Sequence, residues 1–438
     1  MEIVRGFVGV LIILGVAVAF SRNRKAIDWR LVGSGILLQI VIGVLITQVP
    51  FVKSGFESVS EGFVTFLGFT EAGAGFLFGP LADVDSSGFI FVFQVLTTIV
   101  FFSAVSTGLY YLGILQKIVW VLAWVMKKTM RLSGAESLSV AGNIFLGQTE
   151  APLLVKPFIA GMTKSELMCL MTGGMATIAG GVLAGYVKFL GGSDPVEQAR
   201  FASYLLSASV MNAPAAVVMA KILFPEEHHD QIDTEMKVNP ESVGVNIIDA
   251  VSRGTSDGLG LAMNVGAMLL SFIAIIAAIN YMFTDLLGEW IGYTSDEDVW
   301  ISLNMMIKES TSGAFEGLSL EYLFGQVFRV FAYIMGVEWS ESLLVGSLLG
   351  QKTAINEFVA YSNLSELKAA GDLSSRAIII STYALCGFSN FSSIAIQVGG
   401  IGALAPSQQA NLSKLGLLAL LAASLACLMT GTMAGIIL

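Results

Sequence analysis

Polar and ionisable side chains stand inside long apolar stretches of this 438-residue chain. Such side chains are costly at membrane depth and usually serve a function there. They fall into four clusters of amide, hydroxyl and carboxyl groups: Asn143, Gln148, Thr149 and Glu150; Thr177, within a glycine-rich run; Asn356 and Glu357; and Ser389, Asn390, Ser392 and Ser393.

These clusters offer hydrogen bonding rather than neutralisation of a charged solute. A carboxylate accepts from hydroxyl or ring N–H groups, and an amide both donates and accepts. No arginine cluster accompanies them, and the two histidines, His228 and His229, lie in a polar loop. The set therefore suits a neutral, polyhydroxylated solute. Lys352, the one basic residue beside a cluster, is expected to pair with a carboxylate or to reach toward the membrane surface.

Two of the clusters also contain oxygen atoms that suit a hard cation. A broken membrane helix frees backbone carbonyls, which can join side-chain oxygens around Na⁺. Asn143 and Thr177, with the carbonyls of Leu146 and Ile178, would form such a site if the first polar segment packs on the next span. Spacing alone favours the alternative that these residues bind no ion.

The composition places these clusters in a polytopic membrane protein. Hydrophobic residues make up 55% of the chain and charged residues 13%, with a mean hydropathy of +0.77. Soluble domains carry about 25% charged residues, so soluble, disordered, collagen-like and coiled-coil proteins are excluded. The net charge of −10 argues against a nucleic-acid partner. Three cysteines without a spacing motif indicate neither disulfides nor a metal site.

Eight uncharged runs approach the 20 or so apolar residues that a membrane span requires. They are Gly6–Phe20, Leu31–Pro50, Ile90–Leu115, Leu167–Val187, Phe201–Ala220, Leu259–Phe283, Ala377–Gly400 and Leu415–Leu438. Two further apolar stretches, Leu138–Val155 and Ser342–Tyr361, are interrupted by polar residues. The segment 51–88 is expected to be a partly helical external loop. Residues 117–131 and 318–336 are expected to form interfacial helices, with a short buried connector as the alternative for the first.

A basic cluster after the first span sets the expected orientation. Arg22, Arg24, Lys25 and Arg30 indicate a cytoplasmic loop, because cytoplasmic loops are rich in lysine and arginine. The same cluster argues against cleavage of the first span as a signal peptide. Eight spans then place both termini outside.

The two interrupted segments resemble each other. LGQTE (146–150) stands in the first and LGQKT (349–353) in the second. Each follows a long span and precedes two more, and by the charge count they enter from opposite sides. This order is typical of the inverted-topology repeats of secondary transporters, in which re-entrant hairpins meet near the midplane. A chance match of a few letters is the alternative.

Longer strings in the four clusters carry a more specific resemblance. GQTEAPLLVKPF (147–158), GGMATIAGGVLAGY (173–186), NEFVAY (356–361) and CGFSNFSSIAI (386–396) resemble the concentrative nucleoside transporter family. The resemblance covers nearly the whole chain, which is similar to a compact bacterial member. It implies a homotrimer in the inner membrane. Each protomer would have eight transmembrane helices and two re-entrant hairpins.

The resemblance also implies roles for individual residues. Those contacting the nucleoside would be Gln148, Thr149, Glu150 and Val182 around the base, Glu357, Asn390 and Ser393 at the ribose, and Phe388 packing against it. Sodium would bind Asn143, Thr177 and the carbonyls of Leu146 and Ile178. Asn143, which is replaced in proton-coupled relatives, favours Na⁺. Thr177 stands where close relatives have serine, and Glu338 where relatives often have proline.

The sequence therefore predicts an all-α polytopic membrane protein. The resemblance implies that it imports uridine-like nucleosides, driven by the inward sodium gradient, with elevator-like alternating access. Its expected division is 1–88, two spans and a loop; 89–115, a scaffold helix; 116–223, the first transport repeat; 224–285, a cytoplasmic loop and scaffold helix; and 286–438, the second repeat. Proton coupling, a channel and a membrane-embedded enzyme are the alternatives, of which the enzyme lacks a nucleophile–base motif. Adenosine as a substrate, and purine or pyrimidine preference, stay open.

Overall fold

Helices form almost all of the computed structural model, which describes residues 2–228, 230, 232, 244–294 and 298–437, so that His229 lies outside the described residues. The first half contains α1 (Glu2–Ala19), α2 (Trp29–Gln48), α3 (Pro50–Phe78), α4 (Val84–Ser87), α5 (Thr97–Tyr111), α6 (Ile114–Met130), α7 (Gly134–Gly142), α8 (Lys156–Ile159), α9 (Lys164–Ala176), α10 (Gly180–Gly191) and α11 (Pro195–Leu223). Short turns of 3-10 or π geometry are η1 (Arg24–Ala26), η2 (Gly79–Ala82), η3 (Val92–Leu96) and η4 (Ala151–Val155).

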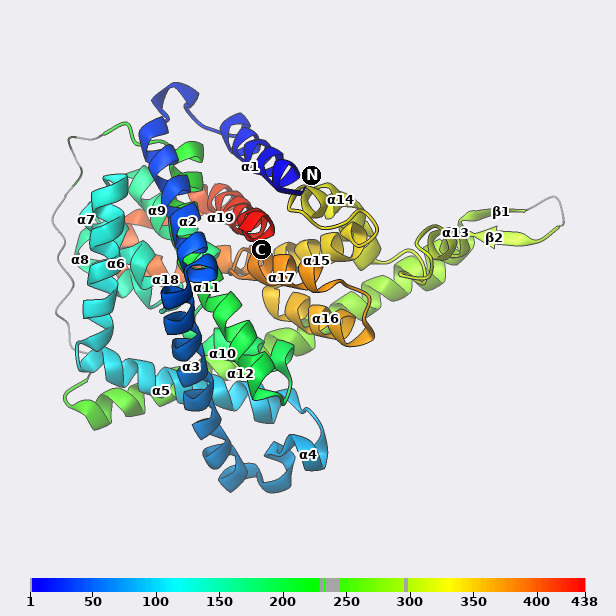
Figure 1. Ribbon diagram of the computed structural model, residues 1–438, viewed down its shortest axis with the longest axis horizontal. Coiled ribbons are helices and arrows are strands. Elements are labelled where there is room, and N and C mark those ends of the chain that lie inside the picture. The colour runs from blue at the N-terminus through cyan, green and yellow to red at the C-terminus, as the bar shows by residue number, and fades with distance from the viewer. Residues whose placement is uncertain (1, 229, 231, 233–243, 295–297, 438) are drawn as a thin grey trace.

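The second half is also helical apart from one small hairpin. It contains α12 (Ile247–Asn280), η6 (Tyr281–Gly288), α13 (Leu303–Ser310), α14 (Leu320–Ile334), α15 (Ser342–Ala354), α16 (Glu357–Ala370), α17 (Ser375–Leu385), α18 (Phe391–Leu404), η7 (Pro406–Gln408) and α19 (Gln409–Ile437). The antiparallel strands β1 (Gly292–Thr294) and β2 (Trp300–Ser302) pair Tyr293 with Ile301 and project beyond α13 (Figure 1).

The prediction of an all-α polytopic membrane fold is confirmed. Seven helical segments within the described chain have the length and apolar composition to cross a membrane: Trp29–Gln48, Pro50–Ala82, Val92–Tyr111, Lys164–Gly191, Pro195–Leu223, Ile247–Gly288 and Pro406–Ile437. The apolar helices at Ile3–Ala19 and Phe391–Leu404 are shorter. Each of the eight runs found in the sequence is helical over most of its length.

Two of those runs are broken rather than continuous. The run 167–187 forms α9 and α10, which are separated by residues 177–179, and the run 377–400 forms α17 and α18, separated by residues 386–390. Both breaks fall on polar clusters found in the sequence. Side chains that bond to nearby backbone offer the chain an alternative to the helix.

The structure differs from the sequence expectation between residues 51 and 88. Most of this segment is one 29-residue helix, α3, rather than a loop with partial helix. Pro50 begins the helix, where its missing N–H costs nothing, and Gly79 ends it with φ of 56°. Ser60, Leu67 and Ala74 are buried at helical spacing, while Glu57, Glu61 and Glu71 are exposed. Reading for uncharged runs misses such an amphipathic helix.

The two halves repeat one order of elements. In the first half, α5 and α6 precede α7, a turn, η4 and α8, and then come the broken pair α9–α10 and the unbroken helix α11. In the second half, α12 and α14 precede α15, a turn and α16, followed by the broken pair α17–α18 and the unbroken helix α19. Both α11 and α19 have 29 residues, and they pack against each other in the middle of the molecule (Figure 1).

The long helices α5 and α12 pack together at the edge of this core. Gly254 and Gly258 allow the contact, because a Cβ at Gly258 would lie 2.7 Å from the Cβ of Ser103. In the most apolar 18-residue stretch of Ile247–Gly288, only 11% of the residues are buried, whereas 94% are buried in the corresponding stretch of Lys164–Gly191. The outer face of α12 is therefore an uncovered apolar surface.

Candidate functional site

The two helix breaks meet in the interior. The backbone N–H of Phe388, in the α17–α18 break, donates to the carbonyl of Thr177, in the α9–α10 break, at 3.2 Å. Gly387 allows this approach, since a Cβ there would lie 2.7 Å from the carbonyl oxygen of Ala176. Residues 211 positions apart in the sequence are thus in direct contact.

The unbroken helices α11 and α19 hold the breaks from either side. On α11, Asn212 donates its amide N–H to the carbonyl of Cys386 at 2.6 Å. On α19, the thiol of Cys427 lies 3.5 Å from the carbonyl oxygens of Ala176 and Cys386. Carbonyls freed by the broken helices are therefore partly satisfied by side chains, as buried backbone groups require.

Glu357 is the first residue of α16 and is 3% exposed. Its carboxylate accepts from the hydroxyl of Tyr186 on α10 at 2.9 Å and from the side-chain amide of Asn390 at 2.8 Å. Asn356 caps the same helix, accepting from the N–H of Val359 at 3.0 Å. A carboxylate at a helix N-terminus is also favoured by the helix dipole.

Asn390 connects Glu357 to the start of α18. Its side-chain oxygen accepts from the N–H of Ser393 at 3.0 Å and from the hydroxyl of Ser392 at 2.7 Å, so it caps α18. The hydroxyl of Ser393 in turn accepts from the side-chain amide of Gln148 at 3.2 Å. One chain of hydrogen bonds therefore joins Glu357, Asn390, Ser393 and Gln148 across both halves of the molecule.

Thr149 and Glu150, next to Gln148, are exposed. The methyl of Thr149 packs near α18, because a Cβ at Gly400 would lie 3.2 Å from it. The carboxylate of Glu150 folds back over Gly147, where any Cβ would collide with it. Both side chains are therefore able to meet a solute.

The residues predicted to bind sodium lie where the turn after α7 packs on the α9–α10 break. Asn143 is 1% exposed, and its N–H₂ donates to the carbonyl of Ser139 at 2.9 Å. Its side-chain oxygen has no hydrogen-bond partner among the described residues. The hydroxyl of Thr177 donates to the carbonyl of Gly173 at 2.8 Å, and a Cβ at Gly173 would lie 3.6 Å from the nitrogen of Asn143.

A backbone hydrogen bond ties this turn to the break directly. The N–H of Gly180 donates to the carbonyl of Phe145 at 3.1 Å. These residues flank Leu146 and Ile178, whose carbonyls were predicted as ligands. Within the described part of the chain, no hydrogen bond to either carbonyl oxygen is found. The Gly180–Phe145 bond therefore holds the turn against the break, and the carbonyl oxygens of Leu146 and Ile178 lack donors among the described residues.

The remaining residues of the site include some predicted from the sequence and two that the sequence did not reveal. Val182 and Phe388 are buried beside the two breaks. Lys352 is buried and donates to the carbonyl of Ala384 at 2.9 Å, so it does not reach the surface, and no carboxylate among the described residues lies within hydrogen-bond distance of it. Sequence reasoning missed Tyr186 and Gln397. Gln397 is 0% exposed on α18 and was detectable as a lone amide in an apolar run.

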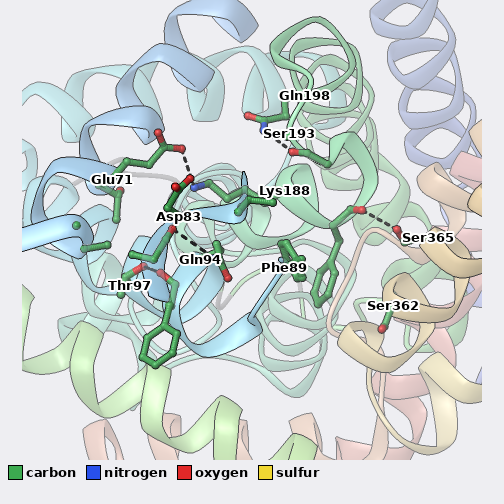
Figure 2. Close-up of a pocket in the computed structure, with 18 of the residues that line it drawn as sticks. Glu71, Asp83, Phe89, Gln94, Thr97, Lys188, Ser193, Gln198, Ser362 and Ser365 are labelled. Atoms are coloured by element: carbon green, nitrogen blue, oxygen red, sulfur yellow. Dashed lines mark hydrogen bonds and ion pairs between the residues drawn. The ribbon is translucent and has the colours of Figure 1, made fainter. Parts of the chain in front are cut away.

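A cavity of about 730 Å³ lies between α3, α10 and α16 (Figure 2). The close-up shows Lys188 reaching Glu71 across it, at 3.4 Å. Aromatic rings lead inward from its lining: Phe189 packs on Phe91, Phe91 on Phe358, and Phe358 on Tyr186, the partner of Glu357. A row of contacting rings therefore lies between the lining of this cavity and the partner of Glu357.

The chain matches three family models that together cover most of its length. Residues 8–81 match the Na⁺-dependent nucleoside transporter N-terminus, residues 92–193 the nucleoside-recognition gate, and residues 204–435 the Na⁺-dependent nucleoside transporter C-terminus. The resemblance found in the sequence is thus confirmed over both halves of the chain.

Similar proteins come from bacteria and animals. An uncharacterised transporter of Haemophilus influenzae is 39% identical to this chain, and the match covers 100% of this chain and 98% of that transporter's length. Sodium/nucleoside cotransporter 1 of Mus musculus is 38% identical, covering 98% of this chain and 63% of its own.

Solved structures of the protein CNTnw share the fold. In an inward-facing substrate-bound state it is 37% identical, with a TM-score of 0.85, covering 100% of this chain and 98% of its own. A variant in an outward-facing state gives a TM-score of 0.87 at 36% identity, with the same coverage. These proteins are transporters rather than enzymes. This chain belongs to the concentrative, Na⁺-dependent nucleoside transporter family, and it is a multi-pass membrane protein that transports nucleosides.

Proposed function

We propose that this protein is a symporter that imports uridine-like nucleosides, driven by the inward sodium gradient. The hydrogen-bond chain from Glu357 through Asn390 and Ser393 to Gln148 carries the proposal. It joins the tips of both helical hairpins in one buried network of donors and acceptors. A nucleoside has hydroxyls at one end and a hydrogen-bonding base at the other, which matches the two ends of this chain.

Within this proposal, the ribose end of the site is built on Glu357. A carboxylate held by Tyr186 and Asn390 keeps lone pairs for the 2′- and 3′-hydroxyls, because each carboxylate oxygen accepts more than one hydrogen bond. Asn390 and Ser393 complete ribose recognition, and Phe388 packs against the nucleoside. Charge-assisted hydrogen bonds of this kind are about twice as strong as neutral ones.

The base end is built on the first hairpin. Gln148, Thr149 and Glu150 bind the base, with Val182 packing nearby. The exposure of Thr149 and Glu150 supports this assignment, since a ligand must reach them. Adenosine fits the same arrangement of amide, hydroxyl and carboxyl groups and is the second substrate to test.

Sodium is the proposed coupling ion. Its ligands would be the side-chain oxygens of Asn143 and Thr177 and the carbonyls of Leu146 and Ile178. The unpartnered, buried oxygen of Asn143 supports the site, because leaving such an acceptor unsatisfied costs about 1–3 kcal/mol. Each Na⁺ entering the cell gains about 2.3 kcal/mol per 100 mV of membrane potential.

The repeated order of elements supports an elevator-like cycle. We propose that the repeats at 116–223 and 286–438, with α7–α8 and α15–α16 as re-entrant hairpins, move together against residues 1–115 and 224–285. The hydrogen bonds between the breaks, and from α11 and α19 to them, would keep the moving unit rigid.

The outer face of α12 supports a homotrimer in a bilayer, since apolar surface of this extent needs lipid or another copy. The mass of the protein in lipid nanodiscs tests the trimer. We propose that both termini lie on the outer side of the inner membrane. Their closeness supports a shared side, because a Cβ at Gly6 would collide with Ile436 (Figure 1).

Labelled uridine uptake into proteoliposomes of the purified protein tests the function. An inward sodium gradient should drive accumulation above equilibrium, and choline in its place at fixed pH should abolish it. Uptake that persists in choline and follows an acid-outside gradient would establish proton coupling instead. Uridine that never accumulates above equilibrium under any ion gradient would indicate a channel. A changed mass of the recovered nucleoside would indicate an enzyme.

A further inference from the structure

Gln397 lies in α18, seven residues after Asn390, and is 0% exposed. Its side-chain nitrogen lies within hydrogen-bond distance of two oxygens, the carbonyl of Met171 at 3.1 Å and the side-chain oxygen of Gln148 at 3.2 Å. Its own side-chain oxygen has no partner among the described residues. Gln397 therefore acts purely as a donor, and both hydrogens of its nitrogen are used.

The carbonyl of Met171 decides which way this amide points. A backbone carbonyl oxygen can only accept, so the nitrogen of Gln397 must face it. The second hydrogen of that nitrogen then faces Gln148, whose oxygen must point toward it. If the amide of Gln397 were reversed, its oxygen would face two other oxygens, and buried groups would lose their partners.

Ser393 imposes no such direction on Gln148. A hydroxyl both donates and accepts, so it can bond to either end of the Gln148 amide. Gln397 is thus the neighbour that distinguishes the two orientations. With one donor and one acceptor already used, Gln148 retains one N–H and one lone pair, in a fixed order, for a solute.

We propose that Gln397 is a specificity-determining positioning residue, which fixes the order of donor and acceptor that Gln148 presents to the nucleobase. This inference rests on the proposed function, in which Gln148 contacts the base. The order matters because uracil and cytosine have opposite edges. Uracil has an N3–H donor beside the O4 acceptor, whereas cytosine has an N3 acceptor beside the N4 amino donor.

If the Gln148 amide is fixed, it can hydrogen-bond to one of these base edges, and against the other edge it places donor facing donor and acceptor facing acceptor. A site built to hydrogen-bond one pattern rejects the opposite one because buried polar groups are left unpaired. An amide free to turn over satisfies both edges. The ratio of kcat/KM for uridine to kcat/KM for cytidine therefore reports the orientation of Gln148.

The test compares this ratio in the wild type, Gln397→Met and Gln39→Met, in proteoliposomes. Methionine is similar in length and cannot donate. We expect the wild-type ratio to differ from one by about tenfold, corresponding to about 1.4 kcal/mol, and Gln397→Met to bring it close to one. Gln39 is a matched control, because it is 0% exposed, donates one bond, to Thr430 at 2.8 Å, and also has an unpartnered oxygen. Its variant should keep the wild-type ratio.

Three results separate this inference from the proposed function. An unchanged ratio in Gln397→Met, or a wild-type ratio near one, overturns the role of Gln397. Gln148→Met tests the base contact itself: if it leaves both uptake and the ratio unchanged, the assignment of Gln148 to the base fails. Should Gln397→Met not fold, Gln397→Leu supplies the test, because leucine likewise cannot donate to Gln148. A ratio that stays at the wild-type value in that variant contradicts the inference.

Discussion

The tips of the two hairpins, around Gln148 and Glu357, have similar sequences but differ in how completely their polar groups are hydrogen-bonded. At the second tip, the carboxylate of Glu357 has two hydrogen-bond donors, and Asn356 caps the helix that carries it. At the first tip, the chain is irregular, Thr149 and Glu150 are exposed, and the side-chain oxygen of Asn143 has no partner in the described chain.

This contrast implies that one tip is preorganised and the other is completed by its ligands. Preorganisation removes part of the ordering cost of binding. An incomplete tip makes the affinity for one ligand depend on the other, and linkage makes that dependence reciprocal. Sodium coupling is therefore expected to reside in the first hairpin and the rigid ribose contact in the second.

Removing the charge of Glu357 should have the largest effect. In Glu357→Gln, we expect uridine uptake to fall by at least about 100-fold, because a charge-assisted acceptor for two hydroxyls is lost at about 1.5–3 kcal/mol per bond. Sodium binding should be retained. Glu366→Gln, an exposed carboxylate on the same helix, is the control and should transport normally. Near-normal uptake by Glu357→Gln would contradict the proposal that Glu357 binds the ribose hydroxyls.

Asn143→Leu should separate the two tips. It removes the unpartnered oxygen at similar volume, so we expect stimulation of uptake by sodium to drop by about tenfold or more, by the loss of one ion ligand. Uptake without sodium should stay at the wild-type level, because the second tip is unchanged. Sodium titrations of uridine uptake measure both quantities. Wild-type sodium stimulation in this variant would place the cation elsewhere.

Tyr186→Phe should sharpen the description of the second tip. Only the hydroxyl that donates to Glu357 is lost, so we expect the KM for uridine to rise by about fivefold to tenfold with kcat little changed. Tyr361→Phe is a matched control, since its ring stacks on Tyr186 at 4.3 Å but its hydroxyl donates to the carbonyl of Thr382. Equal effects of both variants would mean that packing, rather than the bond to Glu357, matters.

The smallest effect is expected at Glu71→Gln, in the cavity of Figure 2. The side chain of Glu71 is 70% exposed and meets Lys188 at 3.4 Å. The side chain of Lys188 is only 9% exposed, but the solvent that surrounds Glu71 screens the pair, so uptake and KM should stay within about twofold of the wild type. A larger loss of uptake would assign this cavity a part in the transport cycle.

The sequence predicted the fold class and the polar clusters, because polar residues are conspicuous in apolar runs. It predicted the runs 167–187 and 377–400 as continuous spans, so both helix breaks were missed, although each falls on one of those clusters. It did not predict α3, since Glu57, Glu61 and Glu71 interrupt the apolar pattern on the exposed side of that helix. Tyr186 and Gln397 were missed for another reason. Their roles depend on contacts with Glu357 and Gln148, which lie 171 and 249 residues away, and spacing along one segment says nothing about such contacts.

The affinity for uridine, measured by calorimetry on the purified protein with sodium and then with choline at equal ionic strength, shows whether sodium completes the first tip. We expect tighter binding as sodium rises, no such change in choline, and weak, sodium-independent binding in Asn143→Leu. Equal uridine affinity in sodium and choline would contradict this expectation, because the first tip would then be complete without a cation.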